Sequence, residues 1–118
     1  MPIPFVCDMT ALDPTQRARH RALAMQLRPA VVAFEELPDG YAARFERSAE
    51  CFGTLAEFMA LESLCCPFFT LALEAACDGG PLRLRITGPD GVKPFIRAEF
   101  GIVEAGAPDA RSLRLPIS

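Results

Sequence analysis

Two adjacent cysteines, Cys65 and Cys66, end a helix-patterned stretch and are followed directly by Pro67. Thiolates are soft ligands that select ions such as Cu(I), zinc and mercury, and a pair of thiols can also carry out redox exchange. The residue before a proline is pushed out of the α-helical conformation, which can turn the two sulfurs toward one another. The pair is therefore the centre of a candidate site for metal binding or thiol redox chemistry.

Glu62 precedes the two cysteines by three and four residues, close enough on a helix to meet either thiol. The helical spacing places it on the stripe formed by Leu55, Phe58 and Cys66, which is expected to face the core. A carboxylate in such a stripe is costly unless it is paired or bound to an ion. We expect Glu62 to serve as an additional metal ligand or as an acceptor beside the thiols.

The cysteines as a set indicate free thiols. All five are irregularly spaced, and no Cys-x-x-Cys pair occurs. In a reducing compartment such a set indicates free thiols, so we expect Cys65 and Cys66 to form no disulfide with Cys7, Cys51 or Cys77. Because Pro67 ends the helix there, we also expect both cysteines to be partly exposed. Cys7, on a segment that could fold back, and His20, on the first helix, are secondary ligand candidates. We assign no role to Cys51, in an expected loop, or to Cys77, beside a turn.

Three kinds of function remain open. The first is a cytosolic soft-metal-binding or metal-responsive protein that holds Hg, Cu(I) or Zn through Cys65 and Cys66. The second is a thiol-dependent redox enzyme in which one cysteine attacks and its neighbour resolves. The negative end of a helix raises a thiol pKa and argues against such an activated nucleophile, which favours metal binding over catalysis. The third is a non-catalytic homodimeric interaction module whose cysteines only pack in the core.

The composition is that of one soluble globular domain. The chain has 118 residues, of which 51% are hydrophobic and 23% charged, and a net charge of −3. This length suits a single core, and no basic face of the kind that binds nucleic acid is expected. No apolar run reaches the ~20 residues of a membrane span, and no signal-peptide pattern is present. We therefore expect a cytoplasmic protein without nucleic-acid or membrane partners.

Local signals predict the elements that must position these residues. Asp13-Pro14-Thr15-Gln16 combines a cap, a proline at the first helical position and a capping-box glutamine, and predicts a helix to about Leu27. Asp-Gly turns within alternating sequence indicate two hairpins. The predicted strands are residues 31–37 and 41–47, then 69–73 and 82–87, and the other helices are residues 54–65 and a segment that includes 95–99.

These elements form two similar halves, each with a strand, an Asp-Gly turn, a second strand and a helix. We predict an α+β fold of order α-ββα-ββα, a two-layer α/β sandwich whose four-stranded, mainly antiparallel sheet has helices on one face. Residues 1–104 are the predicted single domain. Residues 105–118 are expected to form a C-terminal tail or an edge strand, which could pair across a homodimer.

Several segments resemble a family of small, uncharacterised bacterial proteins. The resemblance rests on Leu37-Pro38-Asp39-Gly40-Tyr41, on Glu62 with Cys65-Cys66-Pro67-Phe68, and on Gly88-Pro89-Asp90-Gly91. It covers roughly residues 7–100. The family has a Glu-x-x-Cys-Cys-Pro-Phe motif, and its members often occur among heavy-metal resistance genes, mercury resistance especially. The resemblance implies that Glu62, Cys65 and Cys66 form the functional cluster, with a metal ion as partner.

Overall fold

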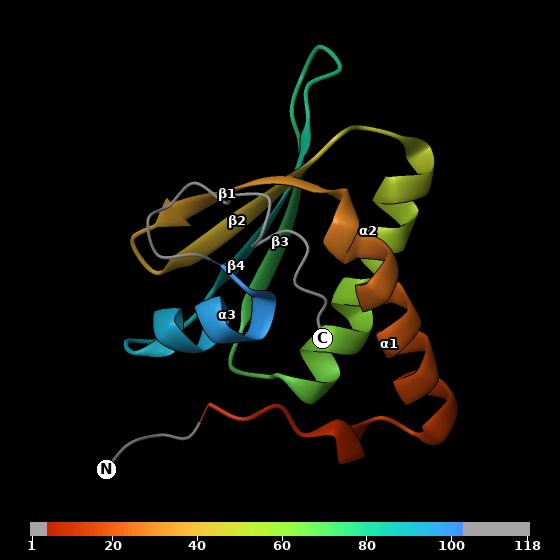
Figure 1. The fold of residues 1–118 in the computed structure, drawn as a ribbon, viewed down its shortest axis with the longest axis vertical. Coiled ribbons are helices and arrows are strands. Elements are labelled where there is room, and N and C mark those ends of the chain that lie inside the picture. Colours follow the sequence, from red (N-terminus) through yellow and green to blue (C-terminus); the bar gives the residue numbers. More distant parts are fainter. Residues whose placement is uncertain (1–4, 103–118) are drawn as a thin grey trace.

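A four-stranded antiparallel sheet lies at the centre of the computed structural model, which describes residues 5–102 (Figure 1). The two hairpins meet at β2 and β4, which pair with each other in the middle of the sheet. The strands are β1 (Val31–Leu37), β2 (Gly40–Phe45), β3 (Thr70–Ala75) and β4 (Leu82–Thr87), in the order β1-β2-β4-β3.

Within residues 5–102, three α-helices complete the predicted α-ββα-ββα order, so the α+β class is confirmed. They are α1 (Pro14–Leu27), α2 (Ala49–Cys65) and α3 (Val92–Phe100), and short 3₁₀ turns occur at Met9–Ala11 and Arg28–Ala30. No helix within residues 5–102 is both long enough and apolar enough to cross a membrane. The predicted tail or edge strand at residues 105–118 lies outside the described residues.

The start of α1 follows the predicted capping box. The Asp13 carboxylate accepts a hydrogen bond from the Gln16 backbone N–H at 2.8 Å, and the Gln16 side chain accepts one from the Asp13 N–H at 3.0 Å. Two backbone donors that a helix start leaves unpaired are thereby satisfied, which stabilises a helix by about 1 kcal/mol. His20 lies in this helix, about two turns after the cap.

Helix α2 begins earlier than predicted. Ser48 caps it by accepting a hydrogen bond from the Cys51 backbone N–H at 3.0 Å, so Cys51 lies in the helix, and its predicted place in a loop is wrong. At the other end the Cys66 N–H donates to the Glu62 carbonyl at 2.8 Å, and Cys66 then leaves the helical conformation with φ −127° and ψ 70°. Pro67 prevents a further turn, as predicted.

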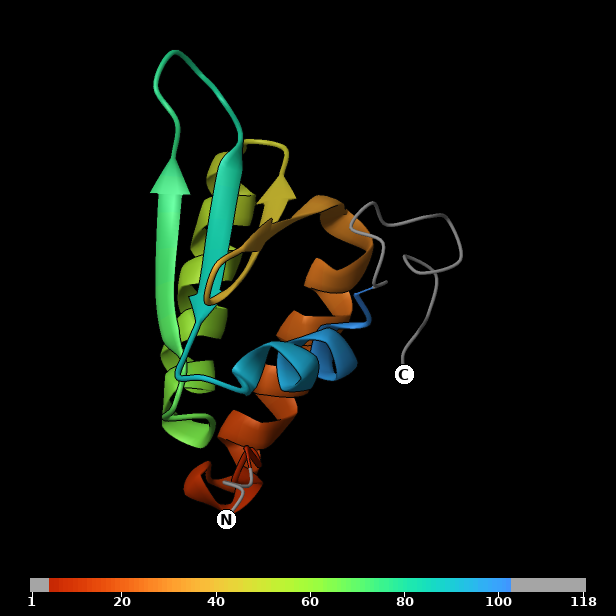
Figure 2. The same ribbon diagram turned by 90° about the vertical axis from the view of Figure 1, so that its left-hand side faces the viewer.

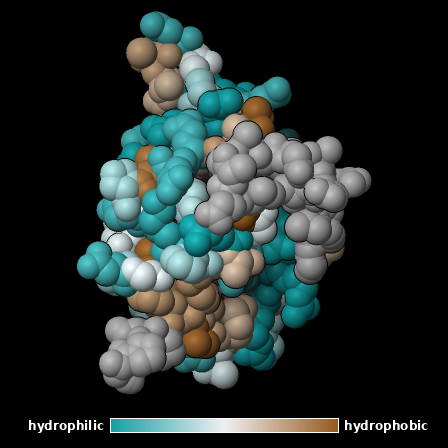
Figure 3. Space-filling model, turned by 60° about the vertical axis from the view of Figure 1, so that its left-hand side comes forward, coloured by the Kyte–Doolittle hydropathy of each residue, from teal (hydrophilic) through white to brown (hydrophobic). Residues whose placement is uncertain are grey.

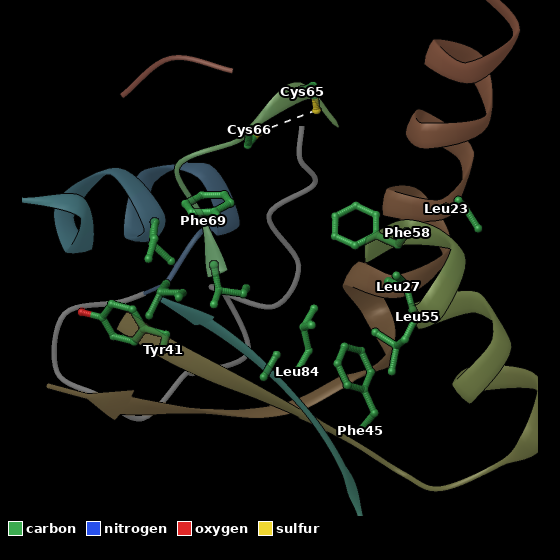
Figure 4. Close-up of a cluster of buried hydrophobic side chains, with 14 of the residues drawn as sticks. Leu23, Leu27, Tyr41, Phe45, Leu55, Phe58, Cys65, Cys66, Phe69 and Leu84 are labelled. Carbon is green, nitrogen blue, oxygen red and sulfur yellow. Dashed lines mark hydrogen bonds between the residues drawn. The ribbon is translucent and has the colours of Figure 1, made fainter. Parts of the chain in front are cut away.

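Along β4, apolar residues that face the core alternate with polar ones. Leu82, Leu84 and Ile86 are buried, and the half-buried Arg83 and Arg85 between them belong to the opposite face. Their neighbours on β2 are buried as well. Buried side chains from all three helices belong to the same cluster: Leu23, Leu27, Leu55, Phe58, Val92 and Ile96. Figure 4 shows part of this cluster.

The N-terminal segment, residues 5–12, passes the C-terminal end of α2 before the chain enters α1 (Figures 1 and 2). Leu12 anchors it in the core, where 1% of that residue is exposed. The surface is more apolar toward this end of the molecule, at the bottom of Figure 3, and Val6 is among the exposed hydrophobic residues of the segment. This crossing brings the start of the chain to the two adjacent cysteines.

Candidate metal centre

Cys7 and Cys66 form a disulfide, with the two sulfurs 2.08 Å apart. The expectation of no disulfide between the cysteine pair and Cys7 is therefore wrong. The physical reason is the path of the N-terminal segment: the Asp8 backbone N–H donates to the Cys65 carbonyl at 2.7 Å, and the Phe5 ring packs edge-on against Phe68 with 5.2 Å between centroids. These contacts place Cys7 directly beside the end of α2.

Both adjacent cysteines are buried, with exposed fractions of 0% for Cys65 and 1% for Cys66, so the expected partial exposure is also wrong. The helix does end where predicted, but the end of α2 lies under the N-terminal segment and belongs to the core cluster. The sulfurs nevertheless approach one another at 3.7 Å, the contact drawn as a dashed line in Figure 4. The sulfurs of Cys7, Cys65 and Cys66 thus meet in one place.

Glu62 faces inward, as its place in the apolar stripe predicted, and only 2% of it is exposed. Its Oε1 lies 2.7 Å from Nε2 of His20, so a residue of α1 and a residue of α2 meet inside the protein. The His20 ring also stacks on Phe58, with 5.3 Å between centroids. This pair explains how α2 carries a carboxylate into an apolar stripe.

The second oxygen of Glu62 has no comparable partner. Within residues 5–102, Glu62 Oε2 and Arg83 Nε are the buried side-chain polar atoms without a hydrogen bond. An unpaired buried polar atom costs about 1–3 kcal/mol, and more when the group is charged. Such an atom requires a physical explanation, and a bound proton or a bound cation would each provide one.

Five candidate ligands lie in two overlapping groups that share Glu62. Cys7, Glu62 and Cys66 form one group, and His20, Glu62 and Cys65 form the other. In each group the ligand atoms all lie within 4.8 Å of one another. Every residue proposed as a ligand from the sequence is therefore brought into one cluster. The two cysteines without an assigned role are elsewhere: Cys51 is half-buried in α2, and Cys77 is exposed in the turn between β3 and β4.

The electrostatics of this cluster favour a positive ligand. Burial raises the pKa of the Cys65 thiol to about 11, and the Glu62 carboxylate contributes to the rise. Loss of hydration raises the pKa of the Glu99 carboxyl on α3, and Glu62 raises it further, whereas Arg28 and His20 act in the opposite direction. The negative charge that raises the pKa of both groups would also stabilise a cation bound beside them.

No protein-family model, curated protein or solved structure matches this chain. The resemblance to proteins with a Glu-x-x-Cys-Cys-Pro-Phe motif therefore stays a prediction. The properties of the site rest on its own geometry: three sulfurs, an imidazole and a carboxylate with one unpaired oxygen.

Proposed function

We propose that this protein binds a soft metal ion through the reduced thiolates of Cys65 and Cys66, with Glu62 as a further ligand. Cys7 and His20 complete the set of nearby donors. The observation that carries the proposal is the unpaired Oε2 of Glu62, a buried carboxylate oxygen beside sulfur ligands. An ion bound there would satisfy this oxygen and compensate its burial.

The donor atoms suit thiophilic ions. Thiolate ligands favour Cu(I), Hg(II) and Zn(II), and a zinc site commonly uses four ligands drawn from cysteine, histidine and carboxylate side chains. Reduction of the Cys7–Cys66 disulfide is required before its sulfurs can bind. We place the metal-binding form in the cytoplasm, where cellular thiols keep cysteines reduced. An ion bound to these donors would connect α1, α2 and the N-terminal segment. Its binding would therefore raise the free energy of unfolding, a property suited to a metal-responsive protein.

A titration of fully reduced protein tests this proposal. The protein is reduced with a phosphine, freed of reductant under nitrogen, and titrated with Cu(I) or Hg(II) against a competing chelator. We expect one ion per chain, and binding at least a hundredfold weaker in the Cys65→Ala/Cys66→Ala double variant. Cys77→Ser, which removes an exposed thiol, is the matched control and should bind like the wild type. Equal affinity in the double variant and the wild type would refute the proposal, provided that far-ultraviolet circular dichroism shows both to be folded.

A thiol-dependent redox enzyme is the second candidate, because a free thiol lies beside a disulfide. Cys65 Sγ is 3.7 Å from Cys66 Sγ, so exchange between the three sulfurs is within reach. The pKa of about 11 argues against Cys65 as an attacking thiolate near neutral pH. A measured pKa well below the ordinary value of about 8.5 for any of the three thiols would favour the enzyme over the metal site.

A further inference from the structure

The two ligand groups differ in how they depend on the disulfide. Both sulfurs of the first group, those of Cys7 and Cys66, are consumed by the S–S bond. The second group takes its sulfur from Cys65, which stays a free thiol while the disulfide is closed. One group can therefore bind an ion only after reduction, whereas the other is present in both redox states.

We infer that the Cys7–Cys66 disulfide selects the class of metal ion that the protein binds. With the disulfide closed, His20, Glu62 and Cys65 hold a borderline divalent ion such as Zn(II). With the disulfide reduced, the thiolates of Cys7 and Cys66 become available as well, and a soft ion such as Cu(I) is preferred. This inference rests on the proposed function and adds to it a second ligand set and its redox control.

The ligand set of the closed state fits a borderline ion by its chemistry. It offers one imidazole nitrogen, one carboxylate oxygen and one sulfur, a mixture that zinc accepts at about 2.0–2.3 Å from each ligand atom. His20 Nε2 and Glu62 Oε1 are 2.7 Å apart, and in a tetrahedral zinc site they would separate to about 3.3 Å. The ion would take the place of the hydrogen now shared by the two side chains.

A metal ion from solvent can reach the ligand set of the closed state through the His20 side chain. The His20 side chain is 14% exposed, whereas that of Glu62 is 2% exposed and Cys65 is fully enclosed. An ion can therefore bind first to the imidazole on α1 and then exchange with the proton between His20 and Glu62. Binding to Cys65 releases the thiol proton, so uptake should release protons.

Reduction of the disulfide is expected to begin with attack on the Cys7 sulfur. Cys7 is half-buried and Cys66 is buried, so a small thiolate reaches the Cys7 sulfur first. Its attack forms a mixed disulfide with Cys7, breaks the Cys7–Cys66 bond and releases Cys66 as a thiolate. A second small thiolate then attacks the mixed disulfide and frees Cys7, leaving the small thiol as its own disulfide. In total the protein gains two electrons and two protons, all supplied by two molecules of the small thiol.

Co(II), a spectroscopic substitute for Zn(II), tests the closed state. Protein whose disulfide is verified by mass is titrated with Co(II), and thiolate-to-cobalt absorption is recorded before displacement by Zn(II). We expect one Co(II) bound through one thiolate. Affinity should fall at least tenfold in His20→Gln and the thiolate band should vanish in Cys65→Ser, while Cys77→Ser behaves like the wild type. Absence of any thiolate-to-cobalt absorption in the oxidised wild type would overturn the inference.

The comparison of redox states completes the test. Cu(I) affinity is measured for oxidised and reduced wild type and for Cys7→Ser, which cannot close this disulfide. We expect at least a hundredfold tighter Cu(I) binding after reduction in the wild type, and no dependence on prior oxidation in Cys7→Ser. Equal Cu(I) affinity in both redox states of the wild type would refute the redox control and leave the proposed function standing. Failure of both forms to bind either ion would refute the proposed function itself.

Discussion

His20 Nε2 lies 2.7 Å from Glu62 Oε1, and this contact joins α1 to α2 below the surface. A second pair joins the same two helices: Arg19 and Glu57 meet at 2.7 Å with both side chains about half exposed. The chain thus contains a buried and an exposed polar link between the same two elements. This arrangement allows the effect of burial to be measured directly.

We predict that His20→Ala destabilises the protein by roughly 3 kcal/mol, because it leaves a buried carboxylate with no partner. Glu57→Gln should have a much smaller effect, since an exposed ion pair contributes little. Urea unfolding followed by circular dichroism measures both. If the two substitutions lower the free energy of unfolding equally, the His20–Glu62 contact does not stabilise the helix pair as its burial suggests.

The disulfide should contribute measurably to stability. It closes a loop across a sequence separation of 59 residues, and removal of such a bond costs about 2–5 kcal/mol. We expect Cys7→Ser to lower the unfolding midpoint of oxidised protein and to abolish its dependence on added reductant. Cys77→Ser should keep that dependence, because Cys77 belongs to no disulfide. A midpoint in Cys7→Ser that still shifts with reductant would indicate a different disulfide pairing.

The free thiols should react with iodoacetamide in a fixed order. Cys77 is exposed and should be modified first, followed by half-buried Cys51. Cys65 should be modified only on unfolding, because it is fully enclosed and a pKa of about 11 leaves about one thiol in a thousand ionised at pH 8. Mass spectrometry of timed samples without reductant gives the order. Modification of Cys65 as fast as Cys77 would show that the end of α2 opens freely.

Two glycines should respond in opposite directions to alanine. A Cβ at Gly40, in β2, would lie 1.9 Å from the Ile86 carbonyl oxygen, so Gly40→Ala should destabilise the protein by more than about 2 kcal/mol. A Cβ at Gly53, inside α2, would meet no atom within 4 Å, so Gly53→Ala should stabilise by about 0.5–1 kcal/mol. Thermal unfolding measures both changes. Stabilisation by Gly40→Ala would contradict the close packing of β2 against β4.

The sequence predicted the elements well where local signals were strong. Asp13 and Gln16 indicated the start of α1, and the strands around Asp39-Gly40 and before Gly79 followed from alternation. The predicted start of α2, at Thr54, is too late, because Ser48 is the actual cap. A glycine within the first turns of a helix weakens the local pattern, and the cap together with core packing outweighs it here.

The sequence predicts which residues gather at the candidate site, but it does not predict the disulfide between two of them. The inward direction of Glu62 followed from helical periodicity with Leu55 and Phe58. The Cys7–Cys66 bond depends on where residues 5–12 cross α2, and no local signal fixes a contact across 59 residues. The burial of Cys65 follows from the same crossing, so both errors have one origin.

The Cys7–Cys66 bond also divides the oxidised chain into two parts with different mechanical roles. Helix α1, the first hairpin and α2 lie within the covalent loop, whereas the second hairpin and α3 lie beyond Cys66. A force applied at the two ends of the chain passes through the sulfurs and bypasses the loop. Only the second half would unravel under tension, and reduction would release about 200 Å of additional length from the 59-residue separation.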